Sequence, residues 1–331
     1  MLLASYLSHA AAVQRAAARL GIDAWTRMAD FSLHLRREGT SLRWRPSFIT
    51  TTGSGQAYTD QLTPASTGFA GWFPYPLRRW PLATDKARFK HEAQALGLRT
   101  PAACHDAGQI GGPYLAKAIH SSFGQGLRGP WPAHDPADPD QQLRADEYYE
   151  NFLLGVSAKA WCWAGRCLAL ELVRPAIVTG DGTATLRQLV QALPHAKGRH
   201  DWSLVAHLAL FAGLDHVDAI VPAQREVAVE YRYGSVYRDP LEPSINALDE
   251  ARADGLAGQF HDAARRLQAH VPAFDDPAPT LYTLDAVVDA QGQAWFLEMN
   301  CNPTVHPHAY EALLATVFGA QPAPAAVLAV A

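Results

Sequence analysis

Three side chains that commonly bind hard cations lie close together in the mostly apolar stretch over residues 281–303. Asp285 stands in the first of two apolar runs, and Glu298 and Asn300 stand at alternate positions of the second. Successive side chains of a strand point to opposite faces, so Glu298 and Asn300 would share one face. Carboxylate and amide oxygens suit Mg²⁺, which usually keeps phosphate oxygens among its ligands. The pattern predicts a metal site that serves a phosphate-bearing substrate. A buried aspartate beside two polar hairpin residues is the alternative.

The element that would position these residues is an antiparallel hairpin. Apolar residues alternate over residues 282–288 and 294–299, and the turn at 290–293 contains a glycine. Two alternating runs joined by a short glycine-containing turn are typical of a hairpin. The hairpin would therefore carry the candidate metal ligands on adjacent strands.

Lysine is rare in this chain, which has five lysines among its 28 basic residues, so each lysine merits attention. Lys86 follows Thr84 and Asp85, either of which can cap a helix that ends at Gly97. The helix dipole disfavours a cation in the first turn, so a nearby anion explains Lys86 better than helix stability does. We predict that Lys90 and Lys197 lie on the surface.

A second lysine precedes a loop of small residues. Residues 114–119 form a predicted strand that contains Lys117 and leads into the sequence HSSFGQGLRG. Hydroxyl groups and unhindered backbone N–H groups can cradle a phosphate, while the lysine supplies positive charge. The loop residues that we assign to this role are Ser121, Ser122, Gly124 and Gly126. An ordinary turn is the alternative, and the preceding lysine favours phosphate binding.

Composition limits the classes of function. The chain has 331 residues, 48% hydrophobic residues, a net charge of -4 and a pI near 6.4. These values indicate a soluble globular protein without a basic surface for nucleic acid. No window is long and apolar enough to span a membrane, so we expect no membrane partner. Four cysteines without CxxC spacing predict free thiols, no structural disulfide and a cytoplasmic location.

Periodicity and turn residues predict most of the remaining elements. We expect helices over residues 11–20, 185–193, 203–213, 246–270 and 309–318. We expect strands around the turn in residues 33–44, over 148–154, on both sides of Gly165, and over 226–231. Trp72, Phe73 and Tyr75 are candidates to line a substrate pocket, although each alone more often packs in a core.

Taken together, residues 84–309 resemble the ATP-grasp family, most closely the ATP-grasp module of cyanophycin synthetase and more distantly D-alanine–D-alanine ligase. The likeness rests on the Asp, Glu and Asn trio, on the two lysines, and on the stretch RPAIVTGDGTATLRQLV. It implies an α+β protein in which two α+β lobes clasp ATP, with Mg²⁺ or, in its place, Mn²⁺. The implied lobes are an N-terminal α/β lobe (1–82), a small nucleotide-binding lobe (83–154), a large lobe with the metal site (155–320) and a flexible tail (321–331).

The resemblance also implies a role for each candidate residue. The trio of Asp285, Glu298 and Asn300 would hold the metal, and Lys86 and Lys117 would contact the phosphates. The segment that contacts adenine would contain Glu150, Phe152 and Leu153. The transferred phosphoryl group and the acyl phosphate would be stabilised by Arg174, Arg232 and Lys117, the implied catalytic residues.

The chain departs from the family at several positions. Ser157 stands where relatives usually have an acidic residue for the ribose, and Thr304 stands where the ligases have a glycine. Residues 231–235 replace an NLSTGG-like segment, so acceptor recognition should differ. His308 falls near a histidine that follows the family's terminal motif, and residues 1–80 resemble no known module.

The activity that the resemblance implies is ATP-dependent joining of a carboxylate and an amine, through an acyl phosphate, with release of ADP and phosphate. The partners would be small-molecule or peptide carboxylates and amines, and the family makes a homodimer one expectation. Two alternatives stay open. The same site would serve a kinase that phosphorylates a small molecule, and a non-catalytic nucleotide-binding subunit would keep the fold alone.

Overall fold

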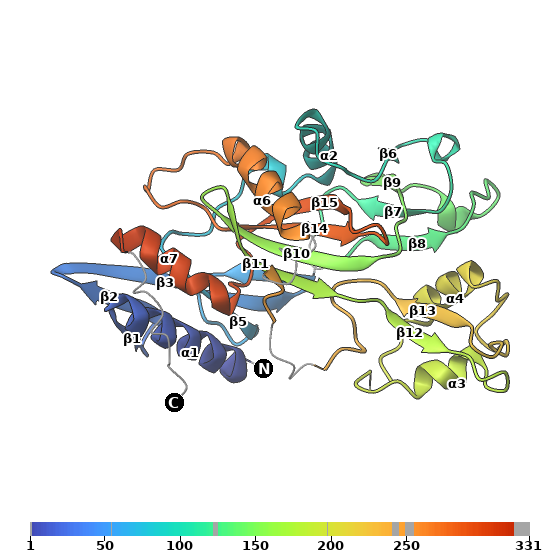
Figure 1. The fold of residues 1–331 in the computed structure, drawn as a ribbon, viewed down its shortest axis with the longest axis horizontal. Helices are drawn as coiled ribbons and strands as arrows, with labels where there is room; N and C mark the ends of the chain where they lie inside the picture. Colours follow the sequence, from blue (N-terminus) through green and yellow to red (C-terminus); the bar gives the residue numbers. More distant parts are fainter. Residues whose placement is uncertain are drawn as a thin grey trace.

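The structure is a computed structural model that describes residues 2–53, 55–121, 125–196, 198–239, 245–248 and 255–320. Four predictions lie outside these residues: the phosphate-cradle roles of Ser122 and Gly124, the surface position of Lys197, and the tail over 321–331. Helices and antiparallel sheets alternate along the chain (Figure 1). The predicted α+β class is confirmed.

The first sheet, here called the N-terminal sheet, has the order β1-β2-β3-β4, with β5 paired to β3. Its strands are β1 (Asp23–Arg27), β2 (Ser32–Arg37), β3 (Thr40–Thr52), β4 (Gly55–Thr59) and β5 (Ser66–Phe73). Helix α1 (Leu2–Leu20) packs on β5 and against α7 (Tyr310–Phe318), so the two ends of the described chain lie together (Figure 1). The aromatic residues Trp72, Phe73 and Tyr75 are buried in this core, which agrees with the core-packing alternative.

The second sheet, the small sheet, has the order β6-β9-β7-β8. Its strands are β6 (Ala103–Cys104), β7 (Tyr114–Ala118), β8 (Leu127–Trp131) and β9 (Glu147–Asn151). Helix α2 (Lys86–Ala95) precedes it and begins as expected, because the Asp85 side chain accepts a hydrogen bond from the Arg88 N–H group. Short 3₁₀ turns join these elements, namely η1 (Pro81–Ala83), η2 (Ala107–Gln109) and η3 (Pro139–Gln141).

The third sheet, the central sheet, has the order β11-β10-β14-β15 and is antiparallel throughout. Its strands are β10 (Val156–Trp163), β11 (Arg166–Val173), β14 (Tyr282–Val288) and β15 (Ala294–Cys301). The last two form the predicted hairpin, with Gly292 in the left-handed region at a φ of 73°. A two-stranded outer sheet of β12 (Ala176–Thr179) and β13 (Glu226–Glu230) extends beyond β11.

Helices cover the outer and central sheets. The outer sheet is covered by α3 (Leu186–Gln191) and α4 (Trp202–Phe211), and Thr185 begins α3 with a capping box that includes Gln188. Helix α6 (Leu256–Leu267), followed by η4 (Gln268–His270), covers one face of the central sheet. Before α7 stands η5 (Pro307–Ala309). Most predicted helices and strands therefore form near their expected bounds, although α1 starts earlier than predicted. The helix predicted over 246–270 includes residues 249–254, which lie outside the described residues, and α6 covers its second half.

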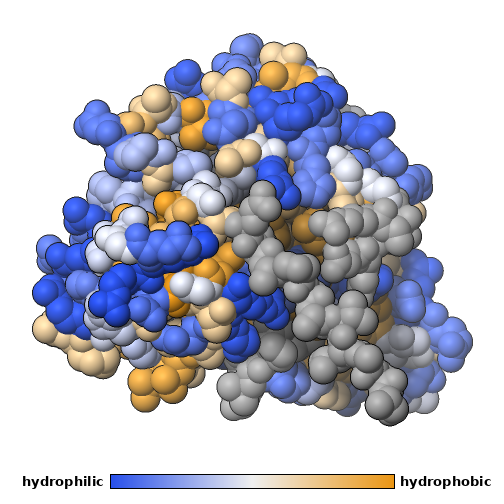
Figure 2. Space-filling model, turned by 60° about the vertical axis from the view of Figure 1, so that its left-hand side comes forward, coloured by the Kyte–Doolittle hydropathy of each residue, from blue (hydrophilic) through white to orange (hydrophobic). Residues whose placement is uncertain are grey.

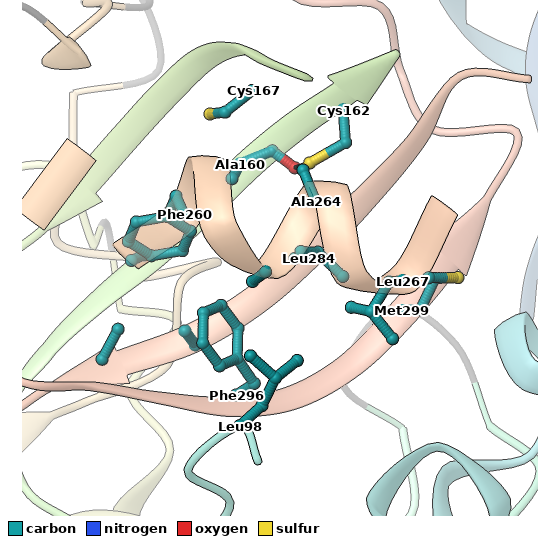
Figure 3. Packing of buried hydrophobic residues seen from close by; sticks show 14 of the residues in the cluster. Leu98, Ala160, Cys162, Cys167, Phe260, Ala264, Leu267, Leu284, Phe296 and Met299 are labelled. Carbon is teal, nitrogen blue, oxygen red and sulfur yellow. Dashed lines mark hydrogen bonds between the residues drawn. The ribbon is translucent and has the colours of Figure 1, made fainter. Parts of the chain in front are cut away.

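The largest core lies between α6 and one face of the central sheet. Phe260 and Leu267 from α6 meet Leu284, Phe296 and Met299 from β14 and β15 (Figure 3). Every side chain in this set is at most 3% exposed. The apolar contacts fix which face of each strand points away from the helix, and that second face carries the polar residues described below.

The surface is mainly hydrophilic on the face shown in Figure 2, with apolar residues gathered only in small patches. Among the described residues, no helix is long and apolar enough to cross a membrane. All four cysteines are free thiols.

Packing of α6 makes a quantitative prediction. Replacing Leu267, which is fully buried, with alanine should lower the free energy of unfolding by about 3 kcal/mol, because it leaves a cavity in the core. The matched control is Leu210→Ala on α4, where the side chain is 41% exposed and the loss should stay below about 1 kcal/mol. Urea denaturation measures both. Equal losses would show that this core does not limit stability.

Candidate functional site

A row of charged residues crosses the polar face of the central sheet. Backbone register pairs Glu171 with Lys159, Lys159 with Asp285, and Asp285 with Glu298, from β11 across to β15. Side chains in register on adjacent strands share one face and are direct neighbours. The sequence produces this arrangement because apolar residues occupy the alternate positions, which face α6. We call these four residues the charge row.

The structure brings the predicted metal trio together, because Asn300 lies beside Asp285 and Glu298 of this row. The Asn300 Nδ2 atom lies 3.2 Å from Asp285 Oδ2 and 3.3 Å from Glu298 Oε1. Two ammonium groups flank the carboxylates, with Lys159 Nζ 2.9 Å from Asp285 Oδ1 and Lys86 Nζ 3.2 Å from Glu298 Oε2. Each carboxylate of the trio therefore has a lysine as its counter-ion.

Burial and neighbouring charges shift the pKa values of Asp285 and Glu298 in opposite directions. Burial raises the pKa of Asp285, and the nearby Glu298 adds to this effect, although Lys159 opposes it. Burial also opposes ionisation of Glu298, but Lys86 and Lys117 outweigh it and lower its pKa. A bound divalent cation would favour the ionised form of both groups.

The chemistry of these donors fits the implied metal. Two carboxylates and an amide offer oxygen ligands of the kind that Mg²⁺ and Mn²⁺ accept. In the described part of the chain, no cluster of three or more His, Cys, Asp or Glu residues could hold a metal ion. The trio could therefore supply only part of a coordination shell, and the remaining ligands would come from substrate oxygens or water.

Lys86, the first residue of α2, contacts both the trio and the segment that follows β7. Its ammonium group donates to the Ser121 backbone oxygen at 2.6 Å and to the Ser121 Oγ at 3.0 Å, in addition to its ion pair with Glu298. An anion thus lies beside this first-turn lysine, as the sequence indicated. Gly126, at the end of the loop, has a φ of 66°, and a Cβ there would lie 2.6 Å from the Ala118 side chain. The loop backbone can pass this strand only without a side chain at that position.

A buried ion-pair cluster supports Lys117. Glu150 is 2% exposed, and its carboxylate lies 3.2 Å from Lys117 Nζ and 2.5 Å from Lys90 Nζ. The Tyr148 hydroxyl also donates to this carboxylate, at 3.3 Å. Burial opposes ionisation of Glu150, but Lys117 and Lys90 outweigh it and lower its pKa. Burial lowers the pKa of Lys117, but Glu150 and Glu298 outweigh it and raise that pKa.

The surface position predicted for Lys90 is wrong. Its side chain is buried, with the residue only 3% exposed, because Glu150 on β9 neutralises its charge inside the protein. Its ammonium group also reaches the Pro101 carbonyl oxygen, at 3.4 Å. Sequence reasoning missed this role because the partner is distant along the chain.

The segment predicted to contact adenine joins the small sheet to the central sheet. Phe152 is buried, and its ring packs against Phe211 and Tyr231, with centroid distances of 5.4 Å and 4.9 Å. Leu153 beside it is half-buried. The carboxylate of Glu150 is occupied by lysines, and its backbone lies in β9, between β6 and β7.

The two predicted arginines lie at one end of the outer sheet. Ala176 pairs with Glu230 at this end; Arg174 lies two residues before β12 begins, and Arg232 lies two residues after β13 ends. Arg232 forms ion pairs with Glu230 at 2.7 Å and Asp201 at 3.1 Å. Arg174 is exposed and has no ion pair or hydrogen bond with any residue that the structure describes. Among the described residues, neither arginine forms an ion pair or a hydrogen bond with a member of the trio.

The structure also places Ser157 and His308, two residues that the sequence comparison with the family singled out. The Ser157 hydroxyl donates to the Tyr231 backbone oxygen at 2.7 Å, so it holds the connection to the outer sheet. His308 is exposed, whereas His306 is 1% exposed and lies 3.4 Å from Glu171.

A cleft of about 300 Å³ opens beside Arg232 between Arg128 and His207, and no member of the trio lines it.

Two residues of the site were not identified from the sequence. Lys159 faces Asp285, and its only sequence signal was a rare lysine within an apolar strand. Tyr58, on β4 of the N-terminal sheet, is the second: burial raises its pKa, while Thr304 and the charge of Lys159 act in the opposite direction. No local pattern around Tyr58 marks it as a site residue.

The comparisons with known proteins give structural likeness alone. No family model and no curated protein matches the sequence. Solved structures that resemble the chain include a bifunctional glutathione synthetase from Pasteurella multocida, with 15% identity, 93% of this chain and 43% of that chain covered, and a TM-score of 0.44. A D-alanine–D-alanine ligase from Bacillus anthracis, complexed with ATP, has 13% identity, 72% and 65% coverage, and a TM-score of 0.34.

A third solved structure is the ATP-grasp ligase PsnB, complexed with a minimal precursor, with 14% identity, 70% and 60% coverage, and a TM-score of 0.33. The chain thus spans less than two thirds of the length of each of these three proteins. Likeness at this level assigns neither an activity nor a substrate.

The Lys90–Glu150 pair yields a prediction for stability. Lys90→Met should lower the free energy of unfolding by about 3 kcal/mol, because it leaves a buried carboxylate with one fewer counter-ion. Adding Glu150→Gln should recover only part of this loss, because the neutral amide no longer needs Lys90 but leaves the buried Lys117 without its counter-ion. Chemical denaturation of the single and double variants gives the coupling energy.

Arg88→Met is the matched control for this cycle, since Arg88 is exposed on the same helix. Its effect should stay within about 0.5 kcal/mol. A loss for Lys90→Met as small as that of the control would contradict a stabilising role for the buried pair.

Proposed function

We propose that this chain is an ATP-dependent carboxylate–amine ligase of the ATP-grasp type. The observation that carries this proposal is the meeting of two elements: the trio of Asp285, Glu298 and Asn300 on the central sheet, and Lys86 with Lys117 beside the small sheet. Carboxylates alone would hold a metal, and lysines alone would hold an anion. Their combination suits a metal-bound polyphosphate such as Mg-ATP.

The lysines would neutralise the phosphates of ATP. Lys86 already contacts Glu298 and the Ser121 oxygens, so it lies between the trio and the glycine-rich loop. Lys117 forms an ion pair with Glu150, and the negative charge of Glu298 also raises the pKa of Lys117. Phosphoryl transfer is accelerated chiefly by positioning and charge neutralisation, so these fixed cations would stabilise negative charge on the transferred group.

The metal would be held by Asp285, Glu298 and Asn300, and when bound it supplies Lewis-acid charge to the phosphate oxygens. Lys159 neutralises Asp285 from one side and Lys86 neutralises Glu298 from the other. The protein's own contribution is to keep both carboxylates at fixed neighbouring positions on a rigid sheet.

The reaction begins when an oxygen of the substrate carboxylate attacks the γ-phosphorus of ATP. The bond from that phosphorus to the bridging oxygen breaks, ADP leaves, and the acid becomes an acyl phosphate. An amine then attacks the acyl carbon, loses a proton, and displaces phosphate to give an amide. Arg174, which has no partner among the described residues, is the cation that we assign to the transferred phosphoryl group, with Arg232 beside it at the same end of the outer sheet.

The proposal is tested by nucleotide product analysis. Purified protein is incubated with Mg-ATP and pooled amino acids and small carboxylates, and ADP and AMP are separated by chromatography. We expect ADP whose formation depends on the pool, and a rate at least about 100-fold lower in Glu298→Gln, because one charged group of the reacting centre is lost. The matched control is Glu226→Gln, an exposed glutamate on β13, which should keep the wild-type rate.

The products distinguish the competing chemistries. AMP in place of ADP would contradict the acyl-phosphate mechanism and indicate adenylation. A stable phosphorylated product that forms without any amine would indicate a kinase. Nucleotide binding without turnover in any pool would indicate a non-catalytic subunit.

A further inference from the structure

A fully buried hydroxyl group without a partner lies beside the metal trio. The Thr283 side chain on β14 is 0% exposed, and its Oγ1 atom makes no hydrogen bond within the described part of the chain. Burying a hydroxyl group without a partner costs free energy, since the group loses its hydrogen bonds with water. Valine would fill the same volume without this cost. Packing alone therefore does not explain a threonine at this position.

Strand register shows which side chains lie next to this hydroxyl group. Thr283 pairs with Trp161 on β10 and with Asn300 on β15. The adjacent pair, Leu284 and Met299, faces α6 in the core (Figure 3). Because successive side chains of a strand alternate between faces, Thr283 and Asn300 share the opposite face, which carries the charge row. Thr283 is thus a direct cross-strand neighbour of one member of the trio.

Neither register neighbour satisfies the hydroxyl group in this structure. The only polar group of the Trp161 side chain, its indole N–H, donates to the Thr304 backbone oxygen at 2.7 Å. The Asn300 Nδ2 atom points instead at the two carboxylates, 3.2 Å from Asp285 Oδ2 and 3.3 Å from Glu298 Oε1. An amide N–H group attracts a carboxylate, but it would repel a cation placed between the same carboxylates. The Asn300 amide would therefore have to turn when a metal binds.

A divalent cation held by the trio requires the Asn300 carbonyl oxygen, because the amide nitrogen carries hydrogens and cannot ligate. Turning Oδ1 toward the carboxylates carries Nδ2 away from them, and Nδ2 then needs a new acceptor. We propose that Thr283 Oγ1 is this acceptor, which makes Thr283 a positioning residue that holds Asn300 in its metal-binding orientation. Directly opposite side chains have Cβ atoms about 5 Å apart, within reach of such a hydrogen bond. The metal is that of the proposed function, on which the role of Thr283 rests.

The test compares affinity for Mn²⁺ with stability, so it does not depend on catalysis. Free Mn²⁺ is measured by electron paramagnetic resonance during titration of the nucleotide-free protein. Thr283→Val keeps the shape of the side chain and should bind Mn²⁺ about ten-fold more weakly than wild type, because the residue that orients a metal ligand loses its hydrogen bond. In EDTA, the same variant should melt at the wild-type temperature or above it, since the deleted hydroxyl group has no partner there.

Two variants control for packing and for the loss of a hydroxyl group in general. Thr283→Ser keeps the hydroxyl group and should bind Mn²⁺ within about two-fold of wild type. Thr100 is also buried, but its Oγ1 atom accepts a hydrogen bond from Gln94 Nε2 at 2.9 Å. Thr100→Val should therefore lower the melting temperature and leave the affinity for Mn²⁺ unchanged, the reverse of the result expected for Thr283→Val.

Asp285→Asn distinguishes failure of this role from failure of the proposed function. If Asp285→Asn weakens Mn²⁺ binding and Thr283→Val does not, the metal site stands and the role of Thr283 is overturned. Equal losses of affinity in Thr283→Ser and Thr283→Val would assign the effect to packing and also overturn it. If wild type and Asp285→Asn bind Mn²⁺ equally, the trio is not a metal site and both proposals fail. Mn²⁺ binding that depends on Thr283, without ADP from ATP, would keep the positioning role and contradict the ligase.

Discussion

The candidate site depends on the register of the central sheet. One face of β10, β14 and β15 must bury apolar side chains against α6, and this requirement decides which residues occupy the other face. A shift by one residue on β14 would place Asp285 in the apolar core and Leu284 on the polar face. Because an unpaired buried carboxylate is costly, the core holds the charge row in place more firmly than the ion pairs among its members do.

The site is also composite, since no single sheet contains all of it. Lys86 and Lys117 come from the small sheet's side, the trio comes from the central sheet, and Tyr58 comes from the N-terminal sheet. A reciprocal pair of hydrogen bonds ties the connections together: the Arg78 N–H donates to the Asn302 side chain at 2.9 Å, and Asn302 donates back at 2.6 Å. Asn302 directly follows β15, the strand that carries Asn300, so this pair limits how far the trio can move relative to the N-terminal sheet.

The parts of the site that could be predicted are those that adjacent residues encode. Glu298 and Asn300 share a strand face, and Asp285 lies one hairpin turn away, so alternation alone brings them together. Lys90 could not be placed in the same way, because its burial depends on Glu150, which only the folding of the small sheet brings beside it. Lys159 and Tyr58 likewise depend on pairing and packing between segments that are distant in sequence. Helix α1 extends further toward the N-terminus than predicted, because tertiary contacts with β5 and α7 help to decide how far a helix extends.

The balance of charge in the site favours a role for a further cation during the proposed reaction. Four lysines, Lys86, Lys90, Lys117 and Lys159, face four carboxylates, Glu150, Glu171, Asp285 and Glu298, so these groups together carry no net charge when all are ionised. Mg-ATP and a substrate carboxylate would both add net negative charge, and more than one positive charge would then be needed to balance them. Arg232 is already neutralised by Glu230 and Asp201, whereas Arg174 lacks a partner among the described residues. Charge balance therefore favours Arg174 as the cation that would stabilise the transferred phosphoryl group in the proposed reaction.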